Sequence, residues 1–208
     1  MPLPENVDTP NFAKFQTRNP VVRRLIDGFY GRLRSIVAPL GADSVLDAGC
    51  GEGETIARLA DLMPDRVAAV DILQESVAFT RERHPFVDAS VGSVYELPFE
   101  DDRFDLVLCL EVLEHLERPP AALRELGRVA RADLVLSVPY EPYFRVGSLL
   151  RGKYVHALGN HPEHINHWNR RSLPAFLGAH LDVIEVGVAF PWLIAHCRPR
   201  QASAVRRG

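Results

Sequence analysis

The chain has 208 residues, of which 47% are hydrophobic, and is long enough for one domain with a sizeable buried core. Lys and Arg number 24 and Asp and Glu number 27, so the formal net charge is −3. This balance argues against a dedicated nucleic-acid-binding protein, which usually carries a basic excess. Cys50, Cys109 and Cys197 show neither metal-ligand nor redox spacing and are expected to be free thiols of a reducing compartment.

The start of the chain and its apolar runs predict a soluble, cytoplasmic protein. Residues 1–8 lack the basic region and the apolar stretch of a signal peptide. The longest apolar run, 106–110, is far shorter than the roughly 20 residues that a membrane span needs. We therefore expect no membrane-spanning segment.

A helix is expected after a patternless, Pro-rich arm of residues 1–18. Asn19 is a good capping residue, and Pro20 suits the first helical position. Apolar residues then recur at helical spacing, which predicts one buried helix face. We interpret residues 1–38 as an arm and a lid helix, with the segment 12–29 covering a ligand pocket.

Short apolar runs and helix-like segments then alternate along the chain. Strands are expected at 44–47, 67–71, 104–110 and 133–138, and helices at 52–63, 74–84 and 119–131. Continuous apolar strands between helices are typical of a parallel sheet covered on both faces. Right-handed crossovers would place the strand-to-helix loops at one edge, where such folds bind ligands.

This alternation ends at Pro139. We expect an irregular stretch rich in aromatics, Gly, His and Asn at 140–168, and a helix at 170–180. Two strands are expected at 181–189 and 190–197, and an Arg-rich tail at 198–208. We interpret the irregular stretch as a substrate-side insertion. No repeat and no second domain is evident, so residues 1–208 are interpreted as a single domain.

The most informative segment is residues 45–53, Val-Leu-Asp-Ala-Gly-Cys-Gly-Glu-Gly, which leaves a strand and enters a helix. A plain tight turn would also explain the glycines. However, Asp47 just before the loop opposes a pyrophosphate and suits an amine, and Glu54 replaces the third glycine of a dinucleotide fingerprint. Asp71 stands about 20 residues further on, where a carboxylate accepts hydrogen bonds from ribose hydroxyls. S-adenosylmethionine has the amine, carboxylate and ribose and lacks the phosphate.

These motifs resemble those of class I S-adenosylmethionine-dependent methyltransferases, of the type 11 and quinone-biosynthesis O-methyltransferase kind. The matching segments are 45–53, Asp71, 97–107 and 111–119. The resemblance is strong over about residues 40–139 and weak over the C-terminal hairpin. It implies an α/β fold: a Rossmann-like three-layer sandwich with a mostly parallel seven-stranded sheet and a C-terminal antiparallel hairpin.

The resemblance also implies a set of cofactor-binding residues, namely Asp47, Gly49, Cys50, Gly51, Asp71, Ile72, Ser93, Val94 and Leu110. The glycine loop with Asp47 would hold the methionine end. Asp71 and Ile72 would meet the ribose and one adenine face. The family often has an acid at the position of Ser93, so the backbone of Val94 would partly replace that contact to the adenine amine.

A second cluster follows the strand that ends nearest the expected reaction centre. On a helix, Glu111, Glu114 and His115 would share one face. Two carboxylates and an imidazole can bind Mg²⁺ or Mn²⁺, and His164 is a further candidate ligand. Similar Glu-x-x-Glu-His segments occur in quinone-biosynthesis O-methyltransferases and small-RNA 3′-terminal 2′-O-methyltransferases, where they imply a metal. Alternatively, Glu111 lines the pocket, Glu114 caps or pairs with Arg, and His115 packs under the sheet.

The sequence therefore predicts a methyltransferase that uses S-adenosylmethionine to methylate a small-molecule hydroxyl. His115, His164 and Glu111 are the candidate catalytic residues, because a hydroxyl must lose its proton to a base or to a cation that lowers its pKa. Tyr140, Tyr143, Phe144, Arg145 and Tyr154 are expected to form the acceptor wall. The alternatives are RNA 3′-terminal 2′-O-methylation, a non-catalytic cofactor-binding protein and, weakest, a nicotinamide-dependent dehydrogenase. We expect no nucleic-acid partner, and the oligomeric state is left open.

Overall fold

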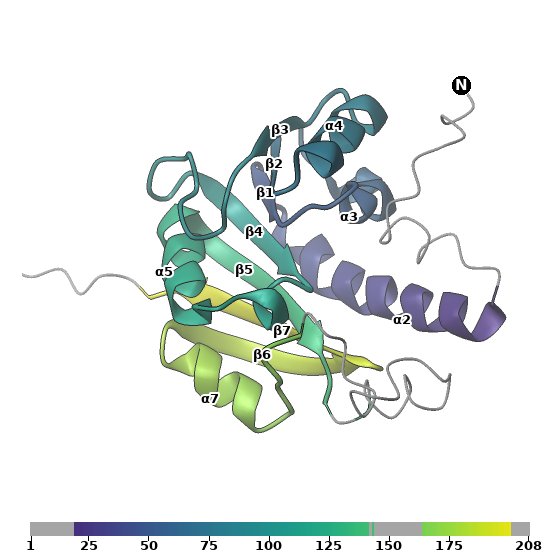
Figure 1. Cartoon of the computed structure of the whole chain (residues 1–208), viewed down its shortest axis with the longest axis vertical. Coiled ribbons are helices and arrows are strands. Elements are labelled where there is room, and N and C mark those ends of the chain that lie inside the picture. The colour runs from purple at the N-terminus through teal and green to yellow at the C-terminus, as the bar shows by residue number, and fades with distance from the viewer. Residues whose placement is uncertain (1–18, 142, 144–163, 201–208) are drawn as a thin grey trace, which may run out of the picture.

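The computed structural model describes residues 19–141, 143 and 164–200 and contains one seven-stranded sheet (Figure 1). The strands, in the spatial order β3-β2-β1-β4-β5-β7-β6, are β1 Val45–Ala48, β2 Val67–Asp71, β3 Asp88–Val91, β4 Phe104–Leu110, β5 Ala130–Pro139, β6 Leu181–Ala189 and β7 Trp192–Pro199. Strands β1 to β5 pair in parallel, whereas β7 is antiparallel to both β5 and β6. The predicted fold class is confirmed.

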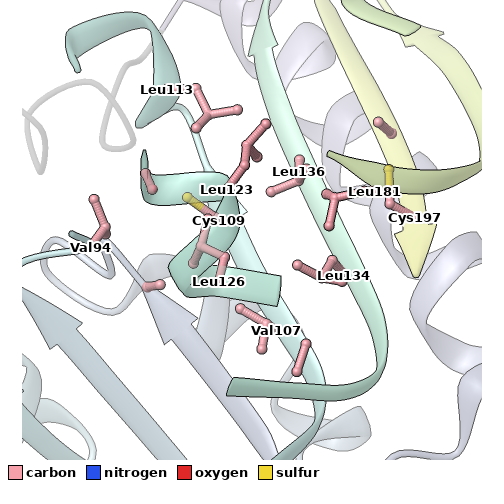
Figure 2. Packing of buried hydrophobic residues seen from close by; sticks show 14 of the residues in the cluster. Val94, Val107, Cys109, Leu113, Leu123, Leu126, Leu134, Leu136, Leu181 and Cys197 are labelled. Atoms are coloured by element: carbon pink, nitrogen blue, oxygen red, sulfur yellow. The ribbon is translucent and has the colours of Figure 1, made fainter. Parts of the chain in front are cut away.

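Helices cover both faces of this sheet (Figure 1). They are α2 Pro20–Val37, α3 Glu54–Arg58, α4 Gln74–Arg83, α5 Pro119–Val129 and α7 Ser172–Gly178, with 3-10 turns η1 Ala38–Leu40, η2 Ala60–Leu62 and η3 Leu113–His115. On one face, Leu123 and Leu126 of α5 belong to the same buried cluster as Val107 and Leu136 of the sheet (Figure 2). Helix α7 packs on this face as well.

Helix α2 covers the opposite face. The Asn19 side chain accepts hydrogen bonds from the first-turn backbone N–H groups, as the sequence predicted. Buried Phe29 and Leu33 of this helix pack in one cluster with Leu106 and Ile194 of the sheet. The apolar face of α2 from Ile26 onward is therefore part of the core, while most of the residues before it are exposed and the lid role of residues 12–29 stays a prediction.

Most element bounds differ from the sequence prediction by one to three residues, and four differences are larger or change the assignment. Helix α3 is only five residues long and continues as the 3-10 turn η2, and the short edge strand β3 was not foreseen. Strand β5 begins at Ala130 instead of Asp133. The predicted tail is wrong at its start, because β7 extends to Pro199 and Arg198 pairs with Asp133. Among the described residues, no helix is long and apolar enough to cross a membrane.

Candidate functional site

The glycine loop lies where β1 ends, beside β2. The backbone N–H groups of Gly49 and Cys50 both donate to the carbonyl oxygen of Val70, at 2.7 and 3.1 Å. Gly49 has a φ of +85°, and a Cβ there would overlap the Cγ2 atom of Val112. A side chain at Gly49 is therefore excluded twice, by backbone strain and by the close approach of the segment after β4.

Asp47 is a buried carboxylate in β1, one residue before the strand ends. Its side chain is 2% exposed, and within the described part of the chain its Oδ2 atom has no hydrogen-bond partner. Burial, together with the nearby carboxylate of Asp71, raises the pKa of Asp47 to about 7. A buried acceptor of this kind is favourable only if a donor meets it, and the ammonium group of S-adenosylmethionine is such a donor.

Asp71 connects the glycine loop to the loop that follows β2. Its carboxylate accepts hydrogen bonds from the backbone N–H groups of Gly51 and Leu73, each at 2.9 Å. The next residue, Ile72, is 72% exposed, and an apolar side chain beside the acid that the sequence predicts to bind a ribose suits the face of an adenine. Together with Asp47, these residues fit S-adenosylmethionine.

The remaining predicted cofactor residues lie around the same sheet edge. The Ser93 hydroxyl accepts a hydrogen bond from the N–H group of Tyr95, while the Val94 side chain is buried in the core. Val94 can therefore offer its backbone, but not its side chain, to a ligand. Leu110 is half-buried at the end of β4. Cys50 is buried, and burial raises the pKa of its thiol above the usual range.

Two residues of α4 and its C-terminal cap support the glycine loop, and the sequence analysis did not find them. Thr80 donates its hydroxyl to the carbonyl oxygen of Gly51 at 2.9 Å. His84 Nε2 lies 3.0 Å from the carbonyl oxygen of Gly53. Burial, with the guanidinium of Arg83 nearby, holds the pKa of His84 below its usual value, so this imidazole is neutral at pH 7. No local sequence pattern indicates these contacts, which depend on packing across 29 and 31 positions.

The prediction that Glu111, Glu114 and His115 share a helix face is wrong. Glu111 has a φ of +58°, and only Leu113–His115 form a 3-10 turn. Ser137 of β5 fixes Glu111: its hydroxyl donates to the Glu111 carboxylate at 2.8 Å and accepts from the Glu111 N–H at 3.1 Å. Glu111 is thereby tied to β5 and is not among the residues whose ligand atoms come together after β4.

Glu114, His115 and His164 do come together, as a group that we call the Glu–His–His cluster. Each offers one ligand atom, and these atoms lie within 4.8 Å of one another. The backbone of the following segment is joined to η3, because the Glu114 carbonyl accepts from the N–H groups of Ile165 and Asn166 at 2.9 and 3.1 Å. The cluster is therefore built from two chain segments whose backbones are hydrogen-bonded to each other.

Aromatic side chains lie together just beyond the end of β5 and in the turn between β6 and β7. The rings of Tyr140 and Tyr143 are 4.9 Å apart, and those of Tyr143 and Phe190 are 5.8 Å apart. Tyr143 and Phe190 are about half exposed. The other expected wall residues, Phe144, Arg145 and Tyr154, lie outside the described residues, as do residues 12–18 of the expected lid.

Comparison with known proteins supports the same fold and a methyltransferase domain. Residues 46–137 match the family described as Methyltransferase domain. A probable S-adenosylmethionine-dependent methyltransferase of Mycobacterium tuberculosis is 38% identical over 108 residues, covering 51% of this chain and 39% of that protein. The chain thus spans less than half the length of this relative.

Two solved structures share the fold over nearly the whole chain. A Pyrococcus horikoshii protein has a TM-score of 0.69 at 18% identity, covering 93% of this chain and 97% of that one. Magnesium protoporphyrin IX methyltransferase from Synechocystis, with bound S-adenosylhomocysteine, has a TM-score of 0.67 at 20% identity, covering 92% and 95%. The fold is that of class I methyltransferases, and residues 46–137 match a methyltransferase domain. Over about half of the chain, the sequence is similar to S-adenosylmethionine-dependent methyltransferases.

Proposed function

We propose that this protein transfers a methyl group from S-adenosylmethionine to a hydroxyl group of a small molecule. The observation that supports cofactor use most directly is the buried Asp47 carboxylate beside the glycine loop. Its Oδ2 atom accepts no hydrogen bond from any described residue, so a donor on a bound ligand can meet it. A chain that needed only a tight turn would gain nothing from a carboxylate buried at this cost.

S-adenosylmethionine supplies a methyl group that its sulfonium centre already activates. The protein's own residues therefore have to bind, orient and exclude water. Asp47 accepts from the ammonium group, Asp71 accepts from the ribose hydroxyls, and Ile72 packs against the adenine. None of these steps needs a nucleophilic side chain of the protein.

A hydroxyl acceptor loses its proton as its oxygen bonds to the methyl carbon and the carbon–sulfur bond breaks. In this proposal the proton goes to the imidazole of His115 or His164 when neither is bound to a metal ion, while Glu111, held by Ser137 at the end of β4, lines the pocket. The exposed rings of Tyr143 and Phe190 favour an acceptor with an aromatic or apolar body. Three buried free thiols suit the reducing cytoplasm.

Calorimetric titration with S-adenosylhomocysteine tests cofactor binding. We expect saturable one-site binding that Asp71→Asn weakens at least about tenfold, because hydrogen bonds to a charged group are worth roughly 1.5–3 kcal/mol. Asp182→Asn is the matched control, since Asp182 is an exposed acid on edge strand β6 that pairs with Arg200. Wild-type protein that binds no S-adenosylhomocysteine would overturn the proposal.

A screen with radiolabelled methyl donor tests the acceptor. Catechols, phenols and aliphatic diols are expected to accept label, and RNA 3′ ends are not. Label found only on RNA 3′ ends would replace the small-molecule proposal with the nucleic-acid one. Cofactor binding without label on any hydroxyl, thiol or amine would favour a non-catalytic protein.

A further inference from the structure

We propose that Glu114, His115 and His164 form a binding site for one divalent transition-metal ion. The site's use in catalysis rests on the proposed hydroxyl methylation, whereas its ability to bind an ion does not. The cluster joins one carboxylate and two imidazoles from segments about 50 residues apart, and their ligand atoms already lie within 4.8 Å of one another.

The distances are those of groups arranged around a shared centre. His115 Nε2 is 4.0 Å from Glu114 Oε1, which is too long for a direct hydrogen bond between these two residues. Two ligands that each stand about 2.1 Å from one ion are roughly 3–4 Å apart. This pair already lies at the upper end of that range, and a small inward movement of the His115 side chain, which is 37% exposed, would tighten the rest of the cluster.

Burial gives the cluster a closed side and an open side. Glu114 is 1% exposed and His164 is 8% exposed, so two of the three ligands are held within the fold. His115 faces solvent. Three protein ligands with an open side leave coordination positions for water or a substrate oxygen, as in catalytic metal sites.

The backbone around the cluster is fixed before any ion binds. The Asn166 side-chain amide donates to the carbonyl oxygens of Leu113 and Leu116, at 3.2 and 2.6 Å. These bonds clamp η3 from both ends and set the position of His164, two residues before Asn166. A preformed backbone lowers the ordering cost of ion binding.

The cluster also adjoins the cofactor loop. Val112, the residue before η3, approaches Gly49 so closely that a Cβ on that glycine would overlap it. Residues 112–115 therefore connect the cofactor loop to the cluster within one turn of chain. An ion there would stand beside the proposed methyl donor and could lower the pKa of an acceptor hydroxyl.

The ligand types favour particular ions. Two imidazoles and one carboxylate suit Mn²⁺, Fe²⁺, Co²⁺ or Zn²⁺, whereas Mg²⁺ and Ca²⁺ prefer sites made of oxygen. The carboxylate and two neutral imidazoles together carry one negative charge, which partly neutralises a divalent cation. Of the two ions expected from the sequence, Mn²⁺ therefore fits this cluster better than Mg²⁺.

Titration of the chelator-treated full-length protein with Mn²⁺, followed by electron paramagnetic resonance, tests the site. Saturable binding of one ion per chain is expected. His115→Ala should weaken it at least about tenfold, because even residues that only support metal ligands contribute that much. His180→Ala is the matched control, since this histidine packs near Phe176 of α7, away from the cluster.

Glu114→Gln provides a second variant. Circular dichroism, together with the affinity for S-adenosylhomocysteine measured in the presence of chelator, shows whether each variant folds. Metal binding that both His115→Ala and Glu114→Gln leave unchanged would overturn the proposal. So would a wild type that takes up neither Mn²⁺ nor Co²⁺. Because S-adenosylhomocysteine affinity is measured without metal, failure of the metal site and failure of the proposed cofactor use give different results.

Discussion

The imidazole of His84 occupies the space that a side chain at Gly53 would need. Its Cδ2 atom lies 2.8 Å from the position of a Cβ built on that glycine, while its Nε2 atom contacts the Gly53 carbonyl oxygen at 3.0 Å. Gly53 itself has a φ of +71°, which favours glycine. The end of α4 thus holds the last turn of the cofactor loop in a conformation that depends on both residues.

His84→Ala is expected to destabilise the protein and to weaken cofactor binding. It removes a buried hydrogen bond and leaves a cavity beside the loop, which together cost about 1–3 kcal/mol. Urea unfolding measures the stability, and calorimetric titration with S-adenosylhomocysteine measures the affinity. His180→Ala, at a half-buried site away from the loop, should change neither. An unaltered affinity in His84→Ala would show that the loop does not need this support.

Gly49→Ala is expected to abolish detectable S-adenosylhomocysteine binding. The added Cβ meets Val112, and the backbone at φ +85° is strained for any side chain. In the double variant Gly49→Ala with Val112→Ala, the steric overlap is relieved and the backbone strain is not. Binding should therefore return only in part. Full recovery would assign the whole effect to the contact with Val112, and no recovery would assign it to the backbone.

The sheet could be predicted from the sequence because its strands are continuous apolar runs with clear ends. Val67–Asp71, Phe104–Leu110 and Leu181–Ala189 have the bounds that were expected. Burial on both faces leaves little choice for the first two of these segments, whereas Leu181–Ala189 is a partly exposed edge strand. The ligand-binding edge followed from the same argument, since parallel strands bring their carboxyl ends together.

The geometry after β4 could not be predicted from local spacing. Residues three and four apart share a face only on a helix, and Glu111 is prevented from joining one by Ser137, 26 residues later. The partner that completes the Glu–His–His cluster, His164, comes from a segment that the sequence showed only as irregular. Both facts depend on tertiary contacts, which override local periodicity.

Glu111→Gln should leave Mn²⁺ affinity unchanged within about twofold, whereas Glu114→Gln should weaken it at least about tenfold. The two substitutions remove the same charge three residues apart, so each is the other's matched control. Only Glu114 belongs to the cluster, while the Glu111 carboxylate is bonded to Ser137. The same paramagnetic titration measures both. Equal losses in the two variants would favour a site built from both carboxylates, as the helix prediction had it.

The stability of the cofactor-free protein is expected to fall as pH rises from about 4 to about 7, through Asp47. Folding raises its pKa from 3.8 to about 7, so between these values the folded state holds a proton that the unfolded state has released. The stabilisation is complete below the pKa that Asp47 has in the unfolded state, and it is lost as the pH rises through the pKa that Asp47 has in the folded state. At about 1.4 kcal/mol per pKa unit, its upper bound is on the order of 4 kcal/mol.

Asp47→Asn has nearly the same shape and cannot ionise, so it isolates this contribution. Urea unfolding at pH 5 and pH 8 measures this contribution. From pH 5 to pH 8, the free energy of unfolding of the wild type should decrease relative to that of Asp47→Asn. Cofactor affinity should change in the opposite direction, because an ionised Asp47 binds an ammonium group more strongly than a neutral one does. S-adenosylhomocysteine affinity is therefore expected to rise between pH 6 and pH 8 in the wild type and to stay level in Asp47→Asn. Parallel pH profiles of the two proteins, in stability and in affinity, would mean that Asp47 is already ionised in the folded protein at pH 5.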